Sequence, residues 1–339
     1  MDAIKVKEDI NELVKLGCLR SLMLFYERYK NEDIFWTPQT CLFASSYGHL
    51  NCLQYLDQNG FPWDEFTCMY AAKNGHLECL KYAHENGCPW NDFTCLYAAM
   101  YGHLECLKYA HENGCPWNER ICVSAAENGH LECLKYAHEN GCPWDAVTCS
   151  WAAWNGHIEC LEYAYENECP WDAYTCKYAA QNGHLVCLIY AYEKGCPWDE
   201  DTCLQAAENG HLECLKYAHE NGCPWFNDTC MFAAKNGNLE CLKYAHENGC
   251  SLEMCTAMAC KDHLECLKYA HKNGCRYPNE FLSIIVKKIL IPKWRDAVKI
   301  RPIIYYWMEH SVKTSCAENG RARNEDINSF VNNFNNLII

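Results

Sequence analysis

Cysteine and histidine are the two residue types in this sequence that could ligate a metal or supply a nucleophile and its base. The 339 residues include 29 cysteines and 15 histidines, and three residues separate His84 from Cys88, a spacing that zinc ligands use. A structural zinc site needs four convergent ligands and usually a C-x-x-C pair, which the sequence lacks. We therefore favour a packing role over zinc binding and predict neither metal nor another cofactor.

The cysteines recur at fixed intervals. All but Cys18, Cys260 and Cys316 fall into three columns, represented by Cys68, Cys79 and Cys88. A catalytic Cys–His pair requires one perturbed constellation in one cleft, whereas many equivalent copies indicate a structural role. Unpaired cysteine packs as a small apolar residue, and a reducing compartment keeps it as a thiol. We predict no catalytic residues and no enzyme activity.

The periodic cysteines belong to a repeat of 27 residues. It reads DEFTCMYAAKNGHLECLKYAHENGCPW at Asp64–Trp90 and NDFTCLYAAMYGHLECLKYAHENGCPW at Asn91–Trp117. A unit of this size cannot bury its own apolar face, so stacking against neighbours must create the core. The sequence therefore predicts an all-α solenoid of stacked helix-turn-helix repeats.

Two helices position the side chains of each unit. We predict a first helix at Thr67–Asn74, with Asp64 favouring its N-terminus. Gly75 supplies a positive φ, and His76–Asn86 forms the second helix. Pro89 ends the unit and is followed by a tryptophan that is expected to wedge between successive units. The second helix is expected to bury Leu77, Leu80, Tyr82 and Ala83.

The repeat defines the predicted organisation. A tryptophan recurs every 27 residues from Trp36 to Trp225, so the register begins before the first clear unit. We predict a divergent N-terminal capping repeat at 1–36, nine repeats at 37–275, and a helical C-terminal cap or extension at 276–339. Glu168 and Asp262 replace glycines at helix ends, and both are expected to distort the backbone at positive φ.

The pattern T-C-x-x-A-A-x-N-G-H-L-E-C-L-K-Y-A resembles the ankyrin repeat over about residues 37–275. Ankyrin repeats run to about 33 residues because a β-hairpin finger joins them, and here Cys-Pro-Trp-Asp replaces most of that finger. The resemblance implies reduced or absent fingers, a protein–protein interaction scaffold, and partners bound on the concave face of the first helices.

The G-C-P-W link and the asparagine-rich and isoleucine-rich end of the chain are similar to the cysteine-rich ankyrin proteins that giant DNA viruses of amoebae, such as mimivirus, encode. This resemblance implies a host or viral protein as the partner, and the host cytoplasm as the location.

Charge narrows the class of partner. Residues 1–275 contain 19 basic and 38 acidic residues, whereas residues 276–339 contain 10 basic and 6 acidic ones. An acidic array repels phosphate, so we predict no nucleic-acid binding. No apolar run approaches the ~20 residues of a membrane span, and acidic residues occupy the N-terminus where a signal peptide would be apolar. We predict an intracellular protein without membrane contact.

Positions at which the units differ from one another are the candidate binding residues. In two columns of the first helix the residue type changes strongly from unit to unit. These columns are three residues apart and therefore lie on one helical face. Large exposed aromatic side chains in such columns are typical binding anchors, although some could simply fill space. The predicted partner-binding residues are Tyr70, Lys73, Tyr97, Met100, Trp151, Trp154, Tyr178, Gln181, Phe232 and Lys235. A third variable column could form the rim, with Phe66, Phe93, Arg120, Val147, Tyr174, Asp201 and Asp228.

The segment after Cys275 offers an alternative function. Phe281, Ile284, Ile285 and Ile289 recur at helical spacing before Pro292, as expected of a cap. The pattern Pro278-x-Glu280-x-Leu282-x-x-Ile285, with the later Trp307, also resembles an F-box or the related C-terminal motif of poxviral ankyrin proteins, although Tyr277 stands where a leucine is typical. That resemblance implies a substrate adaptor that recruits ubiquitin-ligase components.

Overall fold

The computed structural model describes residues 3–32, 35–227, 229–252, 255 and 263–275. Every regular element in these ranges is an α-helix. The chain divides into two compact units, Met1–Trp198 and Asp199–Ile339. The predicted all-α solenoid of stacked repeats is confirmed, and the described ranges contain no β-hairpin finger. The predicted cap at 276–339 lies outside the described residues.

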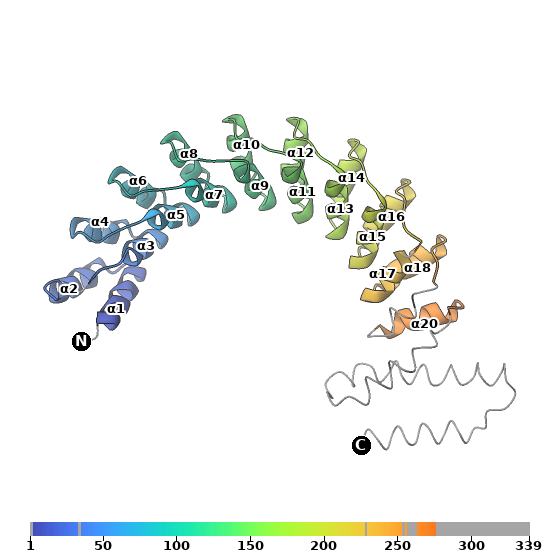
Figure 1. Ribbon diagram of the computed structural model, residues 1–339, viewed down its shortest axis with the longest axis horizontal. Helices are drawn as coiled ribbons and strands as arrows, with labels where there is room; N and C mark the ends of the chain where they lie inside the picture. Colours follow the sequence, from blue (N-terminus) through green and yellow to red (C-terminus); the bar gives the residue numbers. More distant parts are fainter. Residues whose placement is uncertain (1–2, 33–34, 228, 253–254, 256–262, 276–339) are drawn as a thin grey trace, which may run out of the picture. The chain divides into compact units, whose positions relative to one another are not determined.

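The helices alternate along the sequence between a first, odd-numbered helix and a second, even-numbered helix (Figure 1). In the first unit they are α1 (Ala3–Lys15), α2 (Leu19–Tyr29), α3 (Gln39–Ser46), α4 (Leu50–Gln58), α5 (Glu65–Lys73), α6 (Leu77–Glu85), α7 (Asp92–Met100), α8 (Leu104–Glu112), α9 (Arg120–Glu127), α10 (Leu131–Glu139), α11 (Ala146–Asn155), α12 (Ile158–Glu166), α13 (Ala173–Gln181) and α14 (Leu185–Glu193). In the second unit they are α15 (Glu200–Asn209), α16 (Leu212–Glu220), α17 (Thr229–Asn236), α18 (Leu239–Glu247) and α20 (Leu264–Lys272).

Within the first unit, each helix packs against the equivalent helix of the next repeat. The helix α5 contacts α3 and α7, and α6 contacts α4 and α8. The odd-numbered helices form one layer on the inner side of this unit's curve, and the even-numbered helices form the outer layer (Figure 1). Two layers of this kind bury apolar side chains between them and leave one face of each layer exposed.

Capping sets where the first helices begin. The helix predicted at Thr67–Asn74 begins two residues earlier, because the Asp64 carboxylate accepts a hydrogen bond of 3.1 Å from the Phe66 N–H. Asn91 caps the next first helix in the same way through the Phe93 N–H. A side-chain cap satisfies one of the backbone donors that a helix N-terminus leaves unpaired.

A glycine and a histidine from successive repeats meet at the inter-helix turn. Gly75 has φ +75°, and a Cβ at this position would lie 2.5 Å from Nδ1 of His103. Both the conformation and the close approach require glycine. The histidines hold the neighbouring turn, since Nε2 of His49 lies 3.0 Å from the Lys15 carbonyl oxygen.

The core consists of small and medium side chains that repeat from unit to unit. Cys79, Leu80 and Ala83 of α6 are at most 1% exposed. Leu77 and Tyr82, predicted to be buried as well, are half-buried. They lie at the edges of the buried stripe, because only one side of this nine-residue helix faces the neighbouring helices.

Cysteine thiols connect the first helix of a repeat to its closing link. The Cys88 thiol donates to the Asp64 carbonyl oxygen at 3.2 Å, and the Cys68 thiol donates to the Cys88 carbonyl oxygen at 3.9 Å. The described cysteines form no disulfide, and Cys18 is the exposed one among them. Burial raises the pKa of the Cys79 thiol to about 11 and that of Cys106 to about 12, so the reactive thiolate is scarce at neutral pH.

The recurrent tryptophan bridges consecutive repeats, as predicted, by stacking on a histidine. The Trp90 and His84 rings lie 3.7 Å apart at 12°, and the Tyr109 ring of the next repeat meets Trp90 edge-on at 6.3 Å. The Tyr109 hydroxyl completes the group through a hydrogen bond of 3.1 Å with Nδ1 of His84. The tryptophan rings are half-buried rather than buried.

Two consecutive repeats depart from this arrangement, because Tyr165 and Tyr192 stand at the histidine position. Tyr192 stacks on Trp198 at 3.8 Å, and Tyr165 stacks on Trp171 at 4.3 Å. Tyr165 has no imidazole nitrogen to offer, and the buried hydroxyl of Tyr190 has no hydrogen-bond partner. Burial raises the pKa of Tyr190 to about 12. In the repeat of Tyr165, Glu168 has φ +65°, which confirms the expected positive φ at a residue other than glycine. Asp262, expected to be distorted too, lies outside the described residues.

Substituting equivalent tyrosines tests this difference. Tyr136→Phe removes the hydrogen bond of 3.1 Å to His111 and should lower the free energy of unfolding by about 1 kcal/mol. Tyr190→Phe removes a hydroxyl that has no partner, so it should leave the free energy unchanged or raise it. Urea denaturation of both variants makes the comparison. Equal destabilisation by the two substitutions would contradict the assignment.

The histidines at the turns should make stability fall in acid. Burial lowers the pKa of His76, His103 and His130, and neighbouring histidine charges lower it further. The folded state then binds fewer protons than the unfolded state, in which histidine titrates near pH 6.5. The free energy of unfolding therefore decreases as the pH falls below about 6.5.

The control for this effect is present in the chain. Asn238 replaces the turn histidine in one repeat of the second unit, and its amide donates to the Ala207 and Glu208 carbonyl oxygens at 3.1 and 2.8 Å. A triple variant with asparagine at positions 76, 103 and 130 should lose less stability than the wild type between pH 7 and pH 5. Urea titrations at the two pH values measure the difference, and parallel losses would rule out the histidines as its source.

Thiol labelling tests the packing role of the cysteines. Iodoacetamide should alkylate Cys18 readily in the folded protein. It should alkylate Cys41, which is 0% exposed, at least about a hundredfold more slowly, because burial blocks the reagent and disfavours the thiolate. Mass spectrometry of the two distinct peptides gives the rates. In urea the rates should converge. Similar rates in the folded protein would be incompatible with the buried position of Cys41.

Candidate protein-binding surface

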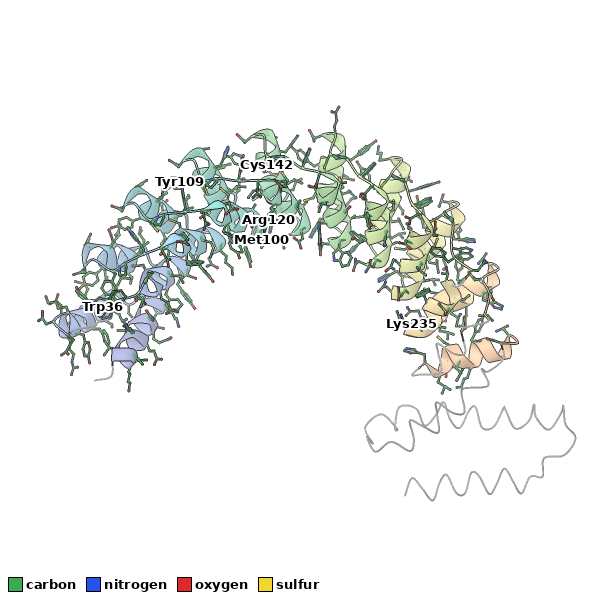
Figure 2. The ribbon with its side chains drawn as sticks, viewed as in Figure 1. Trp36, Met100, Tyr109, Arg120, Cys142 and Lys235 are labelled. Atoms are coloured by element: carbon green, nitrogen blue, oxygen red, sulfur yellow. The ribbon has the colours of Figure 1, made fainter. Side chains whose placement is uncertain are left out.

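All ten predicted binding residues lie on odd-numbered helices. Those of the first unit are on α5, α7, α11 and α13, and the two of the second unit are on α17. Nine of the ten are half-buried, and Lys235 is exposed. Figure 2 shows Met100 and Arg120 on the side of the odd-numbered helices and Tyr109 on the side of the even-numbered helices. The predicted residues of the first unit therefore share its inner layer.

A lysine draws the first group of aromatic rings together. The Lys73 ammonium lies 5.3 Å from the ring centroid of Tyr70, 5.6 Å from that of Tyr97 and 5.2 Å from that of Tyr101. Ring faces attract a cation within about 6 Å. These four residues, here called the lysine cluster, place one positive charge among three phenol rings on α5 and α7.

Tyr101 is the member that sequence reasoning missed. It stands at the end of α7, in a column that the other repeats fill mainly with asparagine, and it is 44% exposed. Its departure from the repeat was the signal that could have identified it. The prediction considered only two columns of the helix, and Tyr101 lies one residue beyond the second of these, after Met100.

The second aromatic group lies on α11 and α13. The Trp151 and Trp154 rings are 5.7 Å apart, and Trp154 meets Tyr178 edge-on at 4.9 Å. Tyr174, a predicted rim residue, adds its ring to Tyr178 at 5.6 Å and is 52% exposed. These four residues are the tryptophan cluster. The structure thus brings together three predicted site residues and one rim residue.

A polar repeat separates the two clusters. The helix α9 carries Ser124 and Glu127 in the two variable columns, between the aromatic rings of α7 and α11. Arg120 extends from the start of α9 to within 5.9 Å of the Phe93 ring. The inner layer of the first unit therefore presents aromatic, polar and aromatic sections in sequence.

Other predicted residues make fewer specific contacts. In the second unit, Lys235 lies 5.6 Å from the Phe232 ring and pairs with Glu208 at 3.5 Å. Met100 and Gln181 are half-buried at the ends of α7 and α13. Among the rim residues, Phe66, Phe93, Arg120, Val147 and Tyr174 are exposed, Asp201 is half-buried, and Asp228 lies outside the described residues.

The chemistry of this surface is that of recognition. Clustered aromatic rings offer large contact area, and a lysine among them adds charge selectivity. Within the described ranges, no group of three or more histidine, cysteine or acidic side chains is arranged to hold a metal ion. In the same ranges, no helix has the length and apolar character needed to cross a bilayer.

Comparison with known proteins identifies the repeat. Family models of ankyrin repeats match residues 41–121, described as three copies, and residues 122–164 and 203–246, described as many copies. No curated protein matches the chain. The crystal structure of the human ASB11 ankyrin repeat domain is similar at 17% sequence identity and a TM-score of 0.47, over 54% of this chain and 99% of that one. With stacked helix pairs across the matched residues, this chain is an ankyrin-repeat protein.

Proposed function

We propose that the chain is a non-enzymatic scaffold that binds a protein partner through the inner, odd-numbered layer of its first unit. The observation that carries this proposal is the tryptophan cluster, in which two tryptophans and two tyrosines lie together on one layer of α11 and α13. Ankyrin repeats typically bind proteins, and tryptophan and tyrosine are enriched among the residues that dominate binding energy.

The position of the tryptophan cluster supports a binding role over a filling role. Trp151 and Trp154 are half-buried, so each ring has packed atoms beneath it and an accessible face above. Equivalent positions carry serine and glutamate on α9, which shows that the fold does not need a large ring there. A partner could cover these faces without moving the helices beneath them.

The lysine cluster defines a second contact region on the same layer. Its single cation is surrounded by phenol rings, which suit an acidic or hydrogen-bonding group of the partner. A partner that reached both clusters would also cross Ser124 and Glu127 on α9. We therefore propose an elongated protein segment rather than a small molecule as the occupant.

The compartment and source of the partner follow from other features. Unpaired thiols persist in reducing compartments, and the described cysteines form no disulfide, which supports a partner inside the cell. The sequence resemblance to giant-virus proteins makes the partner a host or viral protein and the host cytoplasm the expected location. The ligase-adaptor alternative depends on residues 276–339, outside the described residues, and no observation favours it. The division into an N-terminal cap, nine repeats and a C-terminal cap stays part of the proposal.

Affinity capture tests the inner layer. The full chain, immobilised and exposed to amoebal lysate, should retain a specific partner that Trp151→Ala/Trp154→Ala retains at least about tenfold less, since loss of anchor residues typically costs more than 1 kcal/mol each. Quantitative mass spectrometry compares the two captures. Circular dichroism establishes that both proteins are folded.

The matched control lies on the outer layer. Glu132→Ala/Lys135→Ala removes an exposed ion pair of 2.9 Å and should capture the same partner as the wild type. If instead the tryptophan variant captures every protein as well as the control does, the inner layer is not the binding surface. Binding of the purified partner to each variant then gives the affinity directly.

A further inference from the structure

The outer layer carries a regular row of ion pairs. On α6, the Lys81 ammonium lies 3.1 Å from the Glu78 carboxylate three residues earlier, and both side chains are largely exposed. The same pair recurs as Glu105–Lys108, Glu132–Lys135, Glu213–Lys216, Glu240–Lys243 and Glu265–Lys268. Each of these helices is therefore nearly neutral along its solvent-facing row.

The helix α12 interrupts the row with a second acid. Glu159 keeps the glutamate position, but Glu162 replaces the lysine, and the sequence IECLEYAYE has no basic residue. Among the residues that the structure describes, neither carboxylate has an ion-pair partner. Like charges three residues apart on a helix repel each other, so this row carries an uncompensated negative charge.

The helix α14 interrupts the row with apolar residues. Val186 replaces the glutamate and is 63% exposed, and Ile189 replaces the lysine and is half-buried. Among the described even-numbered helices from α4 onward, Val186 is the one large apolar residue that is exposed. A β-branched residue also has a lower helix propensity than the glutamate it replaces, so local helix stability does not explain the substitution.

The two interruptions are neighbours. The helices α12 and α14 pack against each other in the first unit, and the glutamate pair and the apolar pair occupy the same two positions of consecutive repeats. The ankyrin family models match up to residue 164 and resume at residue 203, leaving out the repeat that contains Val186 and Ile189. An acidic section on α12 and an apolar section on α14 therefore adjoin on the outer layer, and the apolar section lies in the repeat that the family models leave out.

We propose that Glu159, Glu162, Val186 and Ile189 form a second docking surface, which binds a protein segment carrying a basic side chain next to an apolar one. The basic group would pair with the two carboxylates of α12, and the apolar group would cover Val186 and Ile189. This surface is on the opposite layer from the tryptophan cluster, so the chain could hold two partners at once.

Charge complementarity selects the occupant. Two unpaired carboxylates attract lysine or arginine, and a nucleic acid or an anionic membrane would be repelled by them. A second copy of this chain is disfavoured by its net charge of −15. A basic and apolar protein segment satisfies both sections of the surface without burying an unpaired charge.

Helix spacing sets the spacing of the partner's side chains. Packed helices lie roughly 8–10 Å apart, and an extended chain advances about 3.3 Å per residue. Side chains of an extended strand alternate between faces, so an extended partner would place its basic residue two or four positions from its apolar residue. A helical partner, which rises about 1.5 Å per residue and returns to the same face after about seven residues, would need about seven positions.

A defined peptide set tests the proposal. Fluorescent peptides of twelve residues carry lysine or arginine two, four or seven positions from leucine or phenylalanine, and a second set has glutamate at the basic position. The full-length chain should bind members of the first set at least about tenfold more tightly than their acidic counterparts, measured by fluorescence anisotropy. Failure of every basic peptide to bind, or equal binding of the acidic set, overturns the proposal.

The flanking repeats supply the matched variant. Glu162→Lys, Val186→Glu and Ile189→Lys together restore the residues that other repeats carry at these positions, so the protein should remain folded by circular dichroism. Peptide binding should weaken at least about tenfold. Unchanged binding would mean that the peptides bind elsewhere, and it would contradict the proposed docking surface. Trp151→Ala/Trp154→Ala should bind the peptides normally, which separates this surface from the proposed inner-layer function.

Discussion

The structure depends on the constraint that a repeat of 27 residues cannot enclose its own core. Leu80 on α6 becomes fully buried only because α4 and α8 flank its helix. The same constraint explains the small residues, since a cysteine or an alanine lets two short helices approach closely. It also explains the glycine and histidine of the turns, where one repeat's imidazole occupies the space beside the preceding repeat's glycine. Stability therefore resides in contacts between repeats, and each repeat keeps outward-facing positions that the fold does not restrict.

Those unrestricted positions carry the chemical differences along the chain. On the inner layer, a column can hold tyrosine, serine or tryptophan without changing the helix beneath it. On the outer layer, a repeated ion pair gives way to two glutamates and then to valine and isoleucine. Both changes leave the buried cysteine, leucine and alanine in place. Exposed side chains of a helix therefore serve binding, and buried side chains of the same helix serve folding. The exposed ones can vary between repeats without loss of the fold.

Most of the fold could be predicted because the repeat presents each signal many times. The helix pair and the positive φ of Glu168 both followed from comparing units. Helix starts were harder, because the Asp64 cap extends α5 by two residues beyond the apolar pattern. Tyr101 was missed, since its contact with Lys73 depends on how two neighbouring helices are placed side by side. The unpaired Tyr190 hydroxyl was equally hidden, because it results from a substitution at residue 165, twenty-five positions earlier.

The Tyr165 substitution has a consequence for how the array loses its structure. In a linear array, cooperativity is transmitted from one interface to the next, and it breaks at the weakest interface. The interface between the repeats of α12 and α14 lacks the Tyr–His hydrogen bond that joins α6 to α8, α8 to α10 and α10 to α12. The loop that follows α12 also contains the strained Glu168 backbone. Amide exchange in α14 should therefore proceed through partial openings that leave α6, α8 and α10 closed. The two repeats whose outer surfaces break the pattern, those of α12 and α14, are therefore also the place at which unfolding can begin within the stack.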